Sequence, residues 1–590
     1  MDIFGILSLI GGLAIFLYGM NTMSDGLVSL TGGKLERILA KLTKNKYTAL
    51  LLGTAVTAVI QSSSATTVMV VGFVNSGIMK LEQAVGVIMG ANIGTTITSW
   101  LLSLTGIQSG NFFIKMLKPS SFSPILAVIG VILLMTNKEG TKKRNLGLIL
   151  LGFATLIFGM DTMSASVAPL KDNPAFVGML TTFSKPLFGL IAGTVLTVVI
   201  QSSSASVGIL QALCLSGAVT YGTALPIIMG QNIGTCITAL LSGLGANKNA
   251  KRASFIHLYF NLIGTILFMV AFYGINSFYH FDFLADSASA AGIAVIHSIF
   301  NVVCTVALFP FSGMLVKLAK LTIGRKSDTA EEILPGALAA LDERFLETPS
   351  FAVQMCKEAV DEMAGIATKS FTVAMGLLGN YAEDGYKLVD NLEDEADLYE
   401  DEIGTYIVKL SQRDLSNEDS KMLSAILHTI SDFERISDHA MVVARYAREL
   451  HEKKLTLTPQ SKGELKAFSE AVRDILTLTE KVFVENDITL AKTVEPLEEV
   501  IDTLSREMKK RHIKRLKKGE CNMESGIILE NIITDYERVS DHCSNIAVCL
   551  IEVDANEFDT HRYLNNKVKN NDEAFNEKCM KLMQIYTLPN

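Results

Sequence analysis

Two long stretches of this sequence lack charged side chains altogether. No Asp, Glu, Lys or Arg occurs between Thr48 and Met79, or between Pro186 and Asn247. The eight cysteines have no paired spacing, which argues against a disulfide framework or a zinc site and indicates reduced thiols. The apolar first half also lacks a glycine-rich phosphate loop with Lys, and no nucleophile elbow occurs anywhere. These absences argue against an enzyme and favour a chain whose first half lies in a membrane.

Charge and hydropathy divide the chain into two parts. At 590 residues it exceeds a single domain, and a mean hydropathy of +0.34 with 19% charged residues indicates a membrane part joined to a soluble part. Residues 1–320 hold 19 Lys and Arg against 9 Asp and Glu, a net charge of +10. The remaining residues hold 33 basic and 51 acidic side chains, a net charge of −18. We therefore expect an acidic, solvated domain after residue 320, on the cytosolic side because the thiols are reduced.

Several apolar segments reach the length of about 20 residues that spans a bilayer. They lie near 3–20, 83–106, 112–136, 146–168, 222–246, 253–275 and 290–316. The N-terminus has no basic region and no small-residue cleavage site, so we expect a first membrane span there and not a cleaved signal peptide. Two further uncharged segments, 48–76 and 186–217, are each split by polar residues in the middle, which predicts a helical hairpin or a broken helix.

The polar residues that split these two segments are identical. Gln61-Ser62-Ser63-Ser64-Ala65 returns 140 residues later as Gln201-Ser202-Ser203-Ser204-Ala205. The same offset relates Gly53-Thr54 to Gly193-Thr194, and Gly90-Ala91-Asn92-Ile93-Gly94-Thr95 to Gly230-Gln231-Asn232-Ile233-Gly234-Thr235. A register kept over this distance indicates a duplicated unit. Small residues alone would suit close helix packing, but a Gln and three hydroxyls are costly in lipid and must face protein, water or a ligand.

The basic loops predict the orientation of the two halves. Four basic clusters lie at 34–46, 138–144, 248–252 and 317–326. With all four in the cytoplasm and each Gln-Ser-Ser-Ser segment re-entering without crossing, the N-terminus is outside and the C-terminus inside. The halves then have opposite orientations. Such an inverted repeat is typical of secondary transporters, whose site lies at the repeat interface near the bilayer midplane.

The motif residues offer ligands for two kinds of ion. Amide carbonyls, hydroxyls and unwound backbone carbonyls suit a hard cation such as sodium, whereas hydroxyls and helix N-terminal N–H groups suit a phosphate-like oxyanion. No Lys or Arg lies within the motif segments. The charge of an anion would therefore be met by helix ends and co-bound cations, which predicts obligate coupling to a cation.

Three other polar features lie in the apolar half. Asp161 occupies the repeat position of Asn21, and it is either a cation ligand or a residue near the membrane interface. His257 with Asn261, and His297 with Asn301, form pairs on one helix face. The simpler interpretation of these pairs is that they are polar anchors between packed helices.

Two Gln-Ser-Ser-Ser copies, each followed by Gly-x-Asn-Ile-Gly-Thr, resemble the type II sodium/phosphate cotransporter family in its bacterial form with a fused PhoU-like domain. The resemblance implies a sodium-coupled inorganic phosphate symporter with Na+ as the coupling ion. It assigns substrate and sodium binding to Gln61, Ser62, Ser63, Ser64, Gln201, Ser202, Ser203 and Ser204. Supporting candidates are Thr66, Asn92, Thr95, Asn232, Thr235 and Asp161. Thr66 and Thr67 map onto Ser206 and Val207, so one hydroxyl is lost and the cation sites are expected to differ between the halves.

The acidic half repeats a pair of carboxylates spaced four residues apart. The pairs are Glu393 and Asp397, Glu434 and Asp438, Glu498 and Asp502, and Glu537 and Asp541. Each pair lies on one helix face, where like charges repel. Two pairs facing each other across a bundle would suit a divalent or trivalent metal, although single pairs of this kind are usually surface residues. These residues resemble the acidic motifs of PhoU proteins, which are built as two three-helix bundles.

The predicted fold is all-α: a polytopic membrane transporter with two inverted repeats that contain re-entrant or broken helices, followed by a cytosolic PhoU-like domain of two three-helix bundles. The expected parts are repeats at 1–145 and 146–320, a linker at 321–349, the PhoU-like domain at 350–555 and a tail at 556–590. The alternatives are a phosphate exporter or other oxyanion transporter, or a membrane-anchored phosphate-signalling scaffold. We expect the cell membrane as location and inorganic phosphate and the lipid bilayer as partners, no nucleic acid, and leave a homo-oligomer open.

Overall fold

The computed structural model describes residues 3–31, 34–43, 45–106, 118–138, 140–169, 178, 182–324, 336–555 and 573–589. These residues form α-helices and short 3-10 turns, and none of them belongs to a named strand. The chain divides into two compact units. Unit 1 comprises residues 1–333 and 342–351, and unit 2 comprises 334–341 and 352–590. The all-α prediction is confirmed.

Unit 1 contains the apolar helices. In chain order they are α1 (Ile3–Thr31), α2 (Lys34–Leu42), α3 (Lys46–Ile60), α4 (Ser63–Asn75), α5 (Leu81–Ser103), α7 (Pro119–Thr136), α8 (Lys142–Val167), α10 (Pro186–Ile200), α11 (Ser203–Leu215), α12 (Tyr221–Gly234), α13 (Cys236–Ser242), α14 (Lys248–Tyr279), α15 (Ala290–Leu308) and α16 (Ser312–Thr322). Seven stretches of the described chain are long and apolar enough to cross a bilayer: 3–31, 81–106, 119–136, 142–167, 221–242, 248–279 and 290–322. They correspond to the seven predicted segments, of which 112–136 begins outside the described residues.

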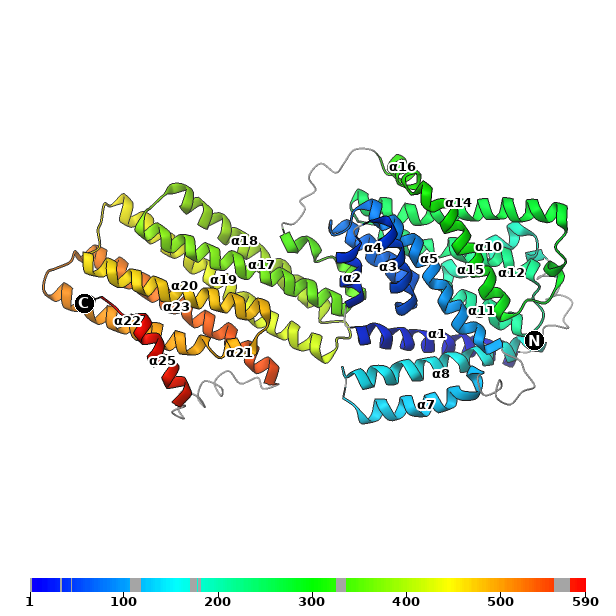
Figure 1. Cartoon of the computed structure of the whole chain (residues 1–590), viewed down its shortest axis with the longest axis horizontal. Helices are drawn as coiled ribbons and strands as arrows, with labels where there is room; N and C mark the ends of the chain where they lie inside the picture. The colour runs from blue at the N-terminus through cyan, green and yellow to red at the C-terminus, as the bar shows by residue number, and fades with distance from the viewer. Residues whose placement is uncertain are drawn as a thin grey trace. The chain divides into compact units, whose positions relative to one another are not determined.

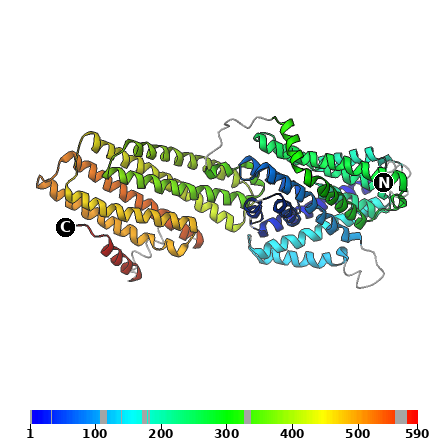
Figure 2. The same cartoon turned by 45° about the horizontal axis from the view of Figure 1, so that its top comes forward.

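The helices α1 and α8, which are equivalent in the two repeats, pack against each other in opposite directions. A Cβ atom added to Gly12, Gly19 or Gly26 would lie within 3.2 Å of the carbonyl oxygen of Gly159, Gly152 or Asn145, respectively. As the residue number rises by seven along α1, the number of the contacting residue on α8 falls by seven. The two helices are therefore antiparallel. Figures 1 and 2 show α1, α8 and α7 side by side. Because equivalent helices run antiparallel, the two repeats are inverted.

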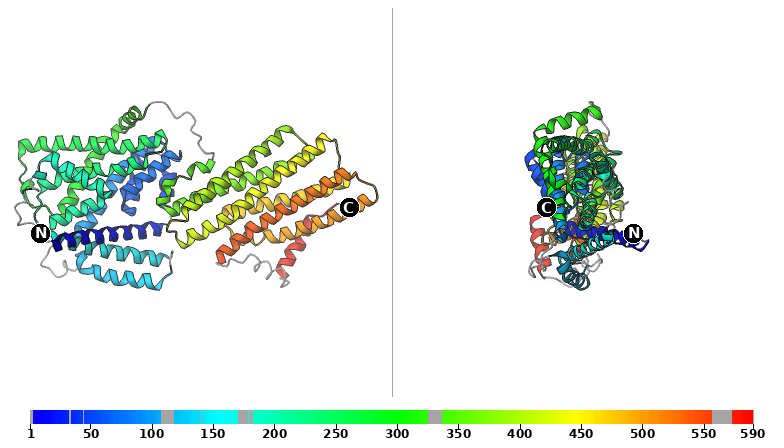
Figure 3. Two further views of the ribbon diagram at one scale, coloured as in Figure 1. Left: turned by 180° about the vertical axis from the view of Figure 1, so that it is seen from behind. Right: turned by 90° about the vertical axis from the view of Figure 1, so that its right-hand side faces the viewer.

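Unit 2 consists of long amphipathic helices. They are α17 (Pro349–Gly379), α18 (Glu383–Leu410), α19 (Asn417–Glu452), α20 (Pro459–Glu485), α21 (Ile488–Ala491), α22 (Val494–Lys517), α23 (Met523–Ala555) and α25 (Glu573–Ile585). The start of α17, up to Phe351, belongs to unit 1. The long helices form two groups of three that run lengthwise beside each other (Figure 3). The first group is α17, α18 and α19, and the second is α20, α22 and α23. The predicted pair of three-helix bundles is therefore present. In the predicted tail, α25 packs on α22.

The predicted linker at 321–349 contains ordered structure. Residues 325–335 lie outside the described part of the chain. Residues 336–340 form a 3-10 turn that belongs to unit 2, whereas Glu343–Glu347 form a second 3-10 turn, η6, that packs on α4 in unit 1. The last part of the predicted linker is thus a packed component of the membrane unit.

Candidate functional site

Each Gln-Ser-Ser-Ser motif lies at the break between two helices. Gln61 has φ 62° and ψ 17°, and Gln201 has φ 58° and ψ 20°. This left-handed conformation ends α3 and α10, and the backbone N–H of each Gln donates to Thr57 O at 2.8 Å or Thr197 O at 2.7 Å. A non-glycine residue held there costs about 1–3 kcal/mol. The same strained backbone at the same place in both repeats points to a functional break.

A serine then starts the second helix of each hairpin. Ser62 Oγ accepts a hydrogen bond from Ala65 N–H at 3.1 Å, and Ser202 Oγ accepts one from Ala205 N–H at 3.2 Å. These caps satisfy one of the free N–H groups in the first turns of α4 and α11, and the others stay available. The N-terminus of a helix attracts anions through such groups and through its dipole. Ser63 and Ser203, each 5% exposed, are the first helical residues.

The hairpin helices are too short to cross a bilayer singly. The helices α3 and α10 have 15 residues, and α4 and α11 have 13. At 1.5 Å per residue these lengths are about 20–22 Å, less than the roughly 30 Å of a hydrocarbon core. A helix of this length that starts at one membrane surface ends inside the hydrocarbon core.

The following helix supports each hairpin through close backbone contacts. Thr54 Oγ1 donates to Gly90 O at 3.1 Å, and Thr194 Oγ1 donates to Gly230 O at 3.1 Å. A Cβ atom on Gly90 would lie 2.1 Å from Leu50 O, and one on Gly230 would lie 2.0 Å from the equivalent carbonyl in repeat 2. The glycines at these positions are thus required for α3 to pack on α5 and for α10 to pack on α12.

The supporting candidates in the Gly-x-Asn-Ile-Gly-Thr segments are buried beside the hairpins. Asn92 and Asn232 are each 4% exposed, and their amide nitrogens donate to the carbonyls four residues earlier. The hydroxyls of Thr95 and Thr235 donate in the same way to their own helices. The two Asn side chains thus use their amide nitrogens to bond their own helices.

The two halves differ at a buried hydroxyl pair. Thr57 Oγ1 donates to Thr66 Oγ1 at 3.0 Å in repeat 1. The equivalent atoms in repeat 2, Thr197 Oγ1 and Ser206 Oγ, are buried and have no hydrogen-bond partner among the described residues. Gln231, which replaces an alanine of repeat 1, donates through Nε2 to Ser206 O at 3.0 Å and leaves its own Oε1 without a described partner.

Thr197 Oγ1, Ser206 Oγ and Gln231 Oε1 are candidate cation ligands that the sequence analysis missed. Thr197, Ser206 and Gln231 are 0% exposed. Buried polar atoms are normally hydrogen-bonded, so three buried oxygens without described partners in one repeat require an explanation. The signal in the sequence was the replacement of Ala91 by Gln231 within an otherwise repeated segment. Three neutral oxygen ligands suit a hard monovalent cation.

The tips of the hairpins also differ in exposure. Gln61 is 8% exposed and its Oε1 has no described hydrogen-bond partner, whereas Gln201 is exposed. Ser24 of α1 donates to Ile60 O at 2.8 Å beside the first tip. Its repeat equivalent, Ser164, makes no such bond in the described chain. The structure thus has one covered and one uncovered tip.

Asp161 is half-buried on α8, and no described hydrogen bond joins it to either motif. The His and Asn pairs lie on fully buried stripes of α14 and α15, each extended by a threonine that the sequence analysis missed. The stripe residues are His257, Asn261 and Thr265, and His297, Asn301 and Thr305. Each stripe holds ring nitrogens, amide oxygens or hydroxyls without partners among the described residues.

Unit 2 brings six of the eight acidic candidates into two clusters. Asp397, Glu434 and Asp438 offer oxygens within 4.8 Å of one another, and Glu498, Asp502 and Asp541 form the second cluster with the same spacing. Burial and then the neighbouring carboxylates raise the pKa of Glu434 to about 7 and that of Glu498 to about 9. Such clusters favour either protons or a hard metal cation.

The other two candidates lie outside these clusters. Glu393 is next to the first cluster, and burial together with repulsion from Asp397 and Asp438 raises its pKa. Glu537 Oε2 accepts hydrogen bonds from Ser505 Oγ at 2.6 Å and Lys509 Nζ at 2.7 Å. Although burial opposes its ionisation, these bonds hold the pKa of Glu537 below its usual value. Glu537 is therefore neutralised by protein groups.

Two similar segments of unit 2, residues 432–439 and 535–542, each begin with Asp and end with His, and they contact each other. His439 Nδ1 lies 2.9 Å from Asp535 Oδ1, and His542 Nδ1 lies 2.8 Å from Asp432 Oδ1. Each His thus pairs with the Asp of the other segment, and the two rings are 5.8 Å apart. This exchange joins α19 to α23 and places the two bundles in a two-fold arrangement.

Comparison with known proteins matches both units. Residues 15–165 and 171–284 match the family model described as Na+/Pi-cotransporter, and residues 360–447 and 465–550 match the PhoU domain. "Putative inorganic phosphate export protein YjbB" of Escherichia coli K12 is 23% identical over 93% of this chain and 97% of its own length. "Uncharacterized protein YqeW" of Bacillus subtilis is 29% identical over 53% of this chain and 96% of its own. The crystal structure of PhoU from Pseudomonas aeruginosa covers 36% of this chain and 99% of its own, with 21% identity and a TM-score of 0.33.

Proposed function

Because the membrane unit belongs to the Na+/Pi-cotransporter family and continues into a PhoU domain, we propose that this chain is a sodium-coupled carrier of inorganic phosphate with a regulatory PhoU domain. The carrier works by alternating access and not by catalysis. The observation that carries this proposal is the pair of strained breaks at Gln61 and Gln201, set in repeats of opposite direction.

Phosphate binds at the helix starts that these breaks create. The residues around it are Gln61, Ser62, Ser63 and Ser64 with their repeat equivalents Gln201, Ser202, Ser203 and Ser204. Hydroxyls and first-turn N–H groups donate to the oxyanion, and the two helix dipoles favour its charge. With no Lys or Arg in these segments, the remaining charge is balanced by sodium.

Sodium binds in repeat 2 at the unpaired oxygens of Thr197, Ser206 and Gln231. In support, these atoms are buried and without described partners, whereas the equivalent pair of repeat 1 is closed by its own hydrogen bond. The difference between the repeats supports one cation site of this kind and not two. Asn232 lies in the same segment and offers a further carbonyl oxygen.

Alternating access follows from the inequality of the two hairpins. In an inverted repeat, exchanging the conformations of the two halves moves the opening from one side of the membrane to the other. The covered Gln61 and the exposed Gln201 are two environments of the same motif. During transport the two motifs exchange these environments, so that Gln61 becomes exposed and Gln201 becomes covered.

The C-terminal unit is cytosolic and regulates the carrier. Its two acidic clusters, Asp397, Glu434 and Asp438, and Glu498, Asp502 and Asp541, hold divalent or trivalent metal ions. The carboxylate oxygens are the ligands that such hard cations prefer. Metal binding displaces the protons that burial and then repulsion within each cluster favour.

The second candidate function is phosphate export. It is favoured by the Escherichia coli relative YjbB, which is named as a phosphate export protein and is matched over 97% of its length. The direction of net phosphate flux is set by the ion gradients and by regulation. The same binding site serves uptake or export.

Transport into liposomes tests the proposal. Purified protein should accumulate labelled phosphate only with an inward sodium gradient, and Ser203→Ala should abolish accumulation. Ser277→Ala, at an exposed serine of α14, is the matched control and should transport normally. Phosphate flux that is indifferent to sodium on either side would refute the coupling.

A further inference from the structure

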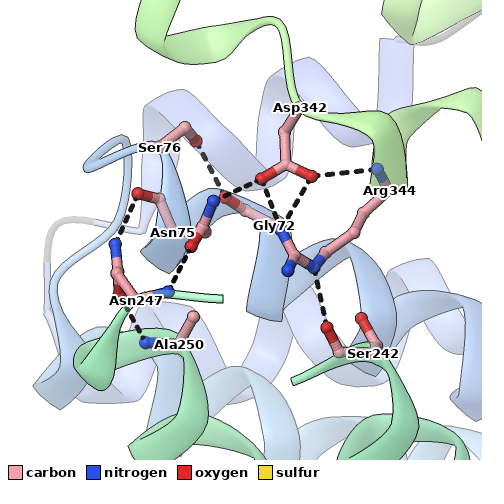
Figure 4. Close-up of polar contacts among 8 residues, drawn as sticks. All are labelled: Gly72, Asn75, Ser76, Ser242, Asn247, Ala250, Asp342 and Arg344. Atoms are coloured by element: carbon pink, nitrogen blue, oxygen red, sulfur yellow. Dashed lines mark hydrogen bonds and ion pairs between the residues drawn. The ribbon is translucent and has the colours of Figure 1, made fainter. Parts of the chain in front are cut away.

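The helix that begins with the first motif is fastened at its other end. The helix α4 runs from Ser63 to Asn75. At Asn75, three parts of unit 1 meet: α4, the start of α14, and residues 342–351, which we call the strap (Figure 4). The strap follows unit 2 residues 334–341 in the chain and precedes the unit 2 residues from Ala352 on.

Asn75 contributes its side-chain amide and its main-chain oxygen to this junction. Its Nδ2 donates to Asp342 Oδ2 of the strap at 2.7 Å, and its Oδ1 accepts from Asn247 N at 2.9 Å. Its main-chain oxygen accepts from Asn247 Nδ2 at 2.7 Å. Asn247 is the N-cap of α14 and accepts from Ala250 N–H at 2.9 Å. A single side chain thus joins α4 to α14 and to the strap.

An arginine of the strap reaches the other repeat. Arg344 Nη1 lies 2.7 Å from Asp342 Oδ2, and both side chains are largely buried. Arg344 Nε donates to Ser242 O at 2.9 Å, at the end of α13. Since α4 belongs to repeat 1 and α13 to repeat 2, the strap connects the repeats at this end of the membrane unit.

Aromatic packing holds the strap against α4. Phe345 and Phe351 of the strap and Phe73 of α4 form a triangle with ring centroids 5.0–5.4 Å apart, and all three are at most 1% exposed. A Cβ atom on Gly72 would lie 2.8 Å from Phe345 Cε1. The repeat 2 positions equivalent to Phe73 and Asn75 are Leu213 and Leu215, so only repeat 1 has this junction.

We propose that the strap is an autoinhibitory restraint: it clamps α4 to repeat 2 and so slows the movement of the first motif, and unit 2 controls transport by tightening or releasing it. Alternating access requires the repeats to move against each other, and the strap is attached to both. It is also continuous with unit 2 at both of its ends. This inference rests on the proposed transport function, but the packing of the strap does not.

Two full-length variants release the strap in different ways. Phe345→Ala empties the aromatic triangle, and Asp342→Asn keeps the shape of the side chain but removes the ion pair with Arg344. The matched control is Phe278→Ala, the same truncation at a ring that is 84% exposed at the far end of α14. If the Phe345→Ala variant does not fold, the milder Asp342→Asn variant still tests the proposal.

The first readout is hydrogen exchange of α4, which does not depend on transport. Both strap variants should exchange amides of residues 63–75 at least about tenfold faster than the control, equivalent to about 1.4 kcal/mol of local stability. The second readout is phosphate uptake into liposomes, whose maximal rate should rise while the KM for phosphate and for sodium stays unchanged.

Unchanged exchange in α4 would overturn the clamp itself. Faster exchange with an unchanged or lower maximal rate would overturn the autoinhibitory role. An altered KM would place these residues in ligand binding instead and would also overturn it. If the unsubstituted chain moves no phosphate, the proposed function fails, whereas the exchange result still decides whether the strap holds α4.

Discussion

Replacing Thr197 by Val tests whether its hydroxyl oxygen is a sodium ligand or an ordinary buried hydroxyl. Valine keeps the branched shape and removes Oγ1, an atom that is buried without a described partner. If that oxygen binds nothing, its removal relieves a desolvation penalty, and the protein should become slightly more stable. If it binds sodium, the variant loses an interaction with a charged group worth about 1.5–3 kcal/mol. That loss raises the half-saturating sodium concentration by roughly 10- to 100-fold.

The inverted repeat supplies the matched control. Thr57→Val makes the same change at the equivalent position, where Oγ1 donates to Thr66 Oγ1 at 3.0 Å. It should cost about 1 kcal/mol of stability, the net value of one hydrogen bond, and leave the sodium dependence as it was. The assay is initial phosphate uptake against sodium concentration in liposomes, with thermal unfolding in detergent measured in parallel. Equal shifts in sodium dependence for both variants, or none for Thr197→Val, would refute the assignment of the cation to repeat 2.

Three further predictions test packing, electrostatics and access. Gly90→Ala should abolish the recovery of folded protein by size-exclusion chromatography, because its Cβ would lie 2.1 Å from a carbonyl oxygen, whereas Gly11→Ala, with nothing within 4 Å, should not. The pKa of Glu434 is raised to about 7, so between about pH 4.5 and 7 the folded state holds more protons than the unfolded state. Metal-free protein should therefore lose stability as pH rises through this window in calorimetry. Glu434→Gln should reduce the slope without abolishing it, because Glu498, whose pKa is raised to about 9, acts in the same sense. Added divalent metal should reduce the slope further, and a rise in stability would contradict the sign. Finally, Gln201→Cys should react faster than Gln61→Cys with a water-soluble maleimide, because only Gln201 is exposed, and equal rates would contradict the inequality of the hairpins.

Much of the fold could be predicted because the duplication is visible residue by residue. The offset of 140 residues predicted the equivalence of Gln61 and Gln201, and the structure gives both the same left-handed backbone. Hydropathy predicted seven spans because the cost of burying charge in lipid acts on each segment independently of its neighbours. The carboxylate pairs predicted acidic clusters, since spacing by four residues fixes a helix face. Which pairs meet was not predictable, and Glu537 is held by Lys509 and Ser505 instead.

The sequence by itself determined the duplicated unit, the broken helices and the division into an apolar basic half and an acidic soluble half, because each depends on local composition or on repetition. Only the tertiary structure decided how far the symmetry holds. Thr57 is paired with Thr66, whereas Thr197 and Ser206 at the equivalent positions have no described partner, although all four belong to the repeat. The strap was likewise not predicted: residues 342–349 were assigned to a linker and 350–351 to the PhoU-like domain. The proposed clamp depends on Asn75, which lies 267 residues earlier than Asp342. Contacts between residues so distant in the chain depend on the packing of whole helices, which no local pattern specifies.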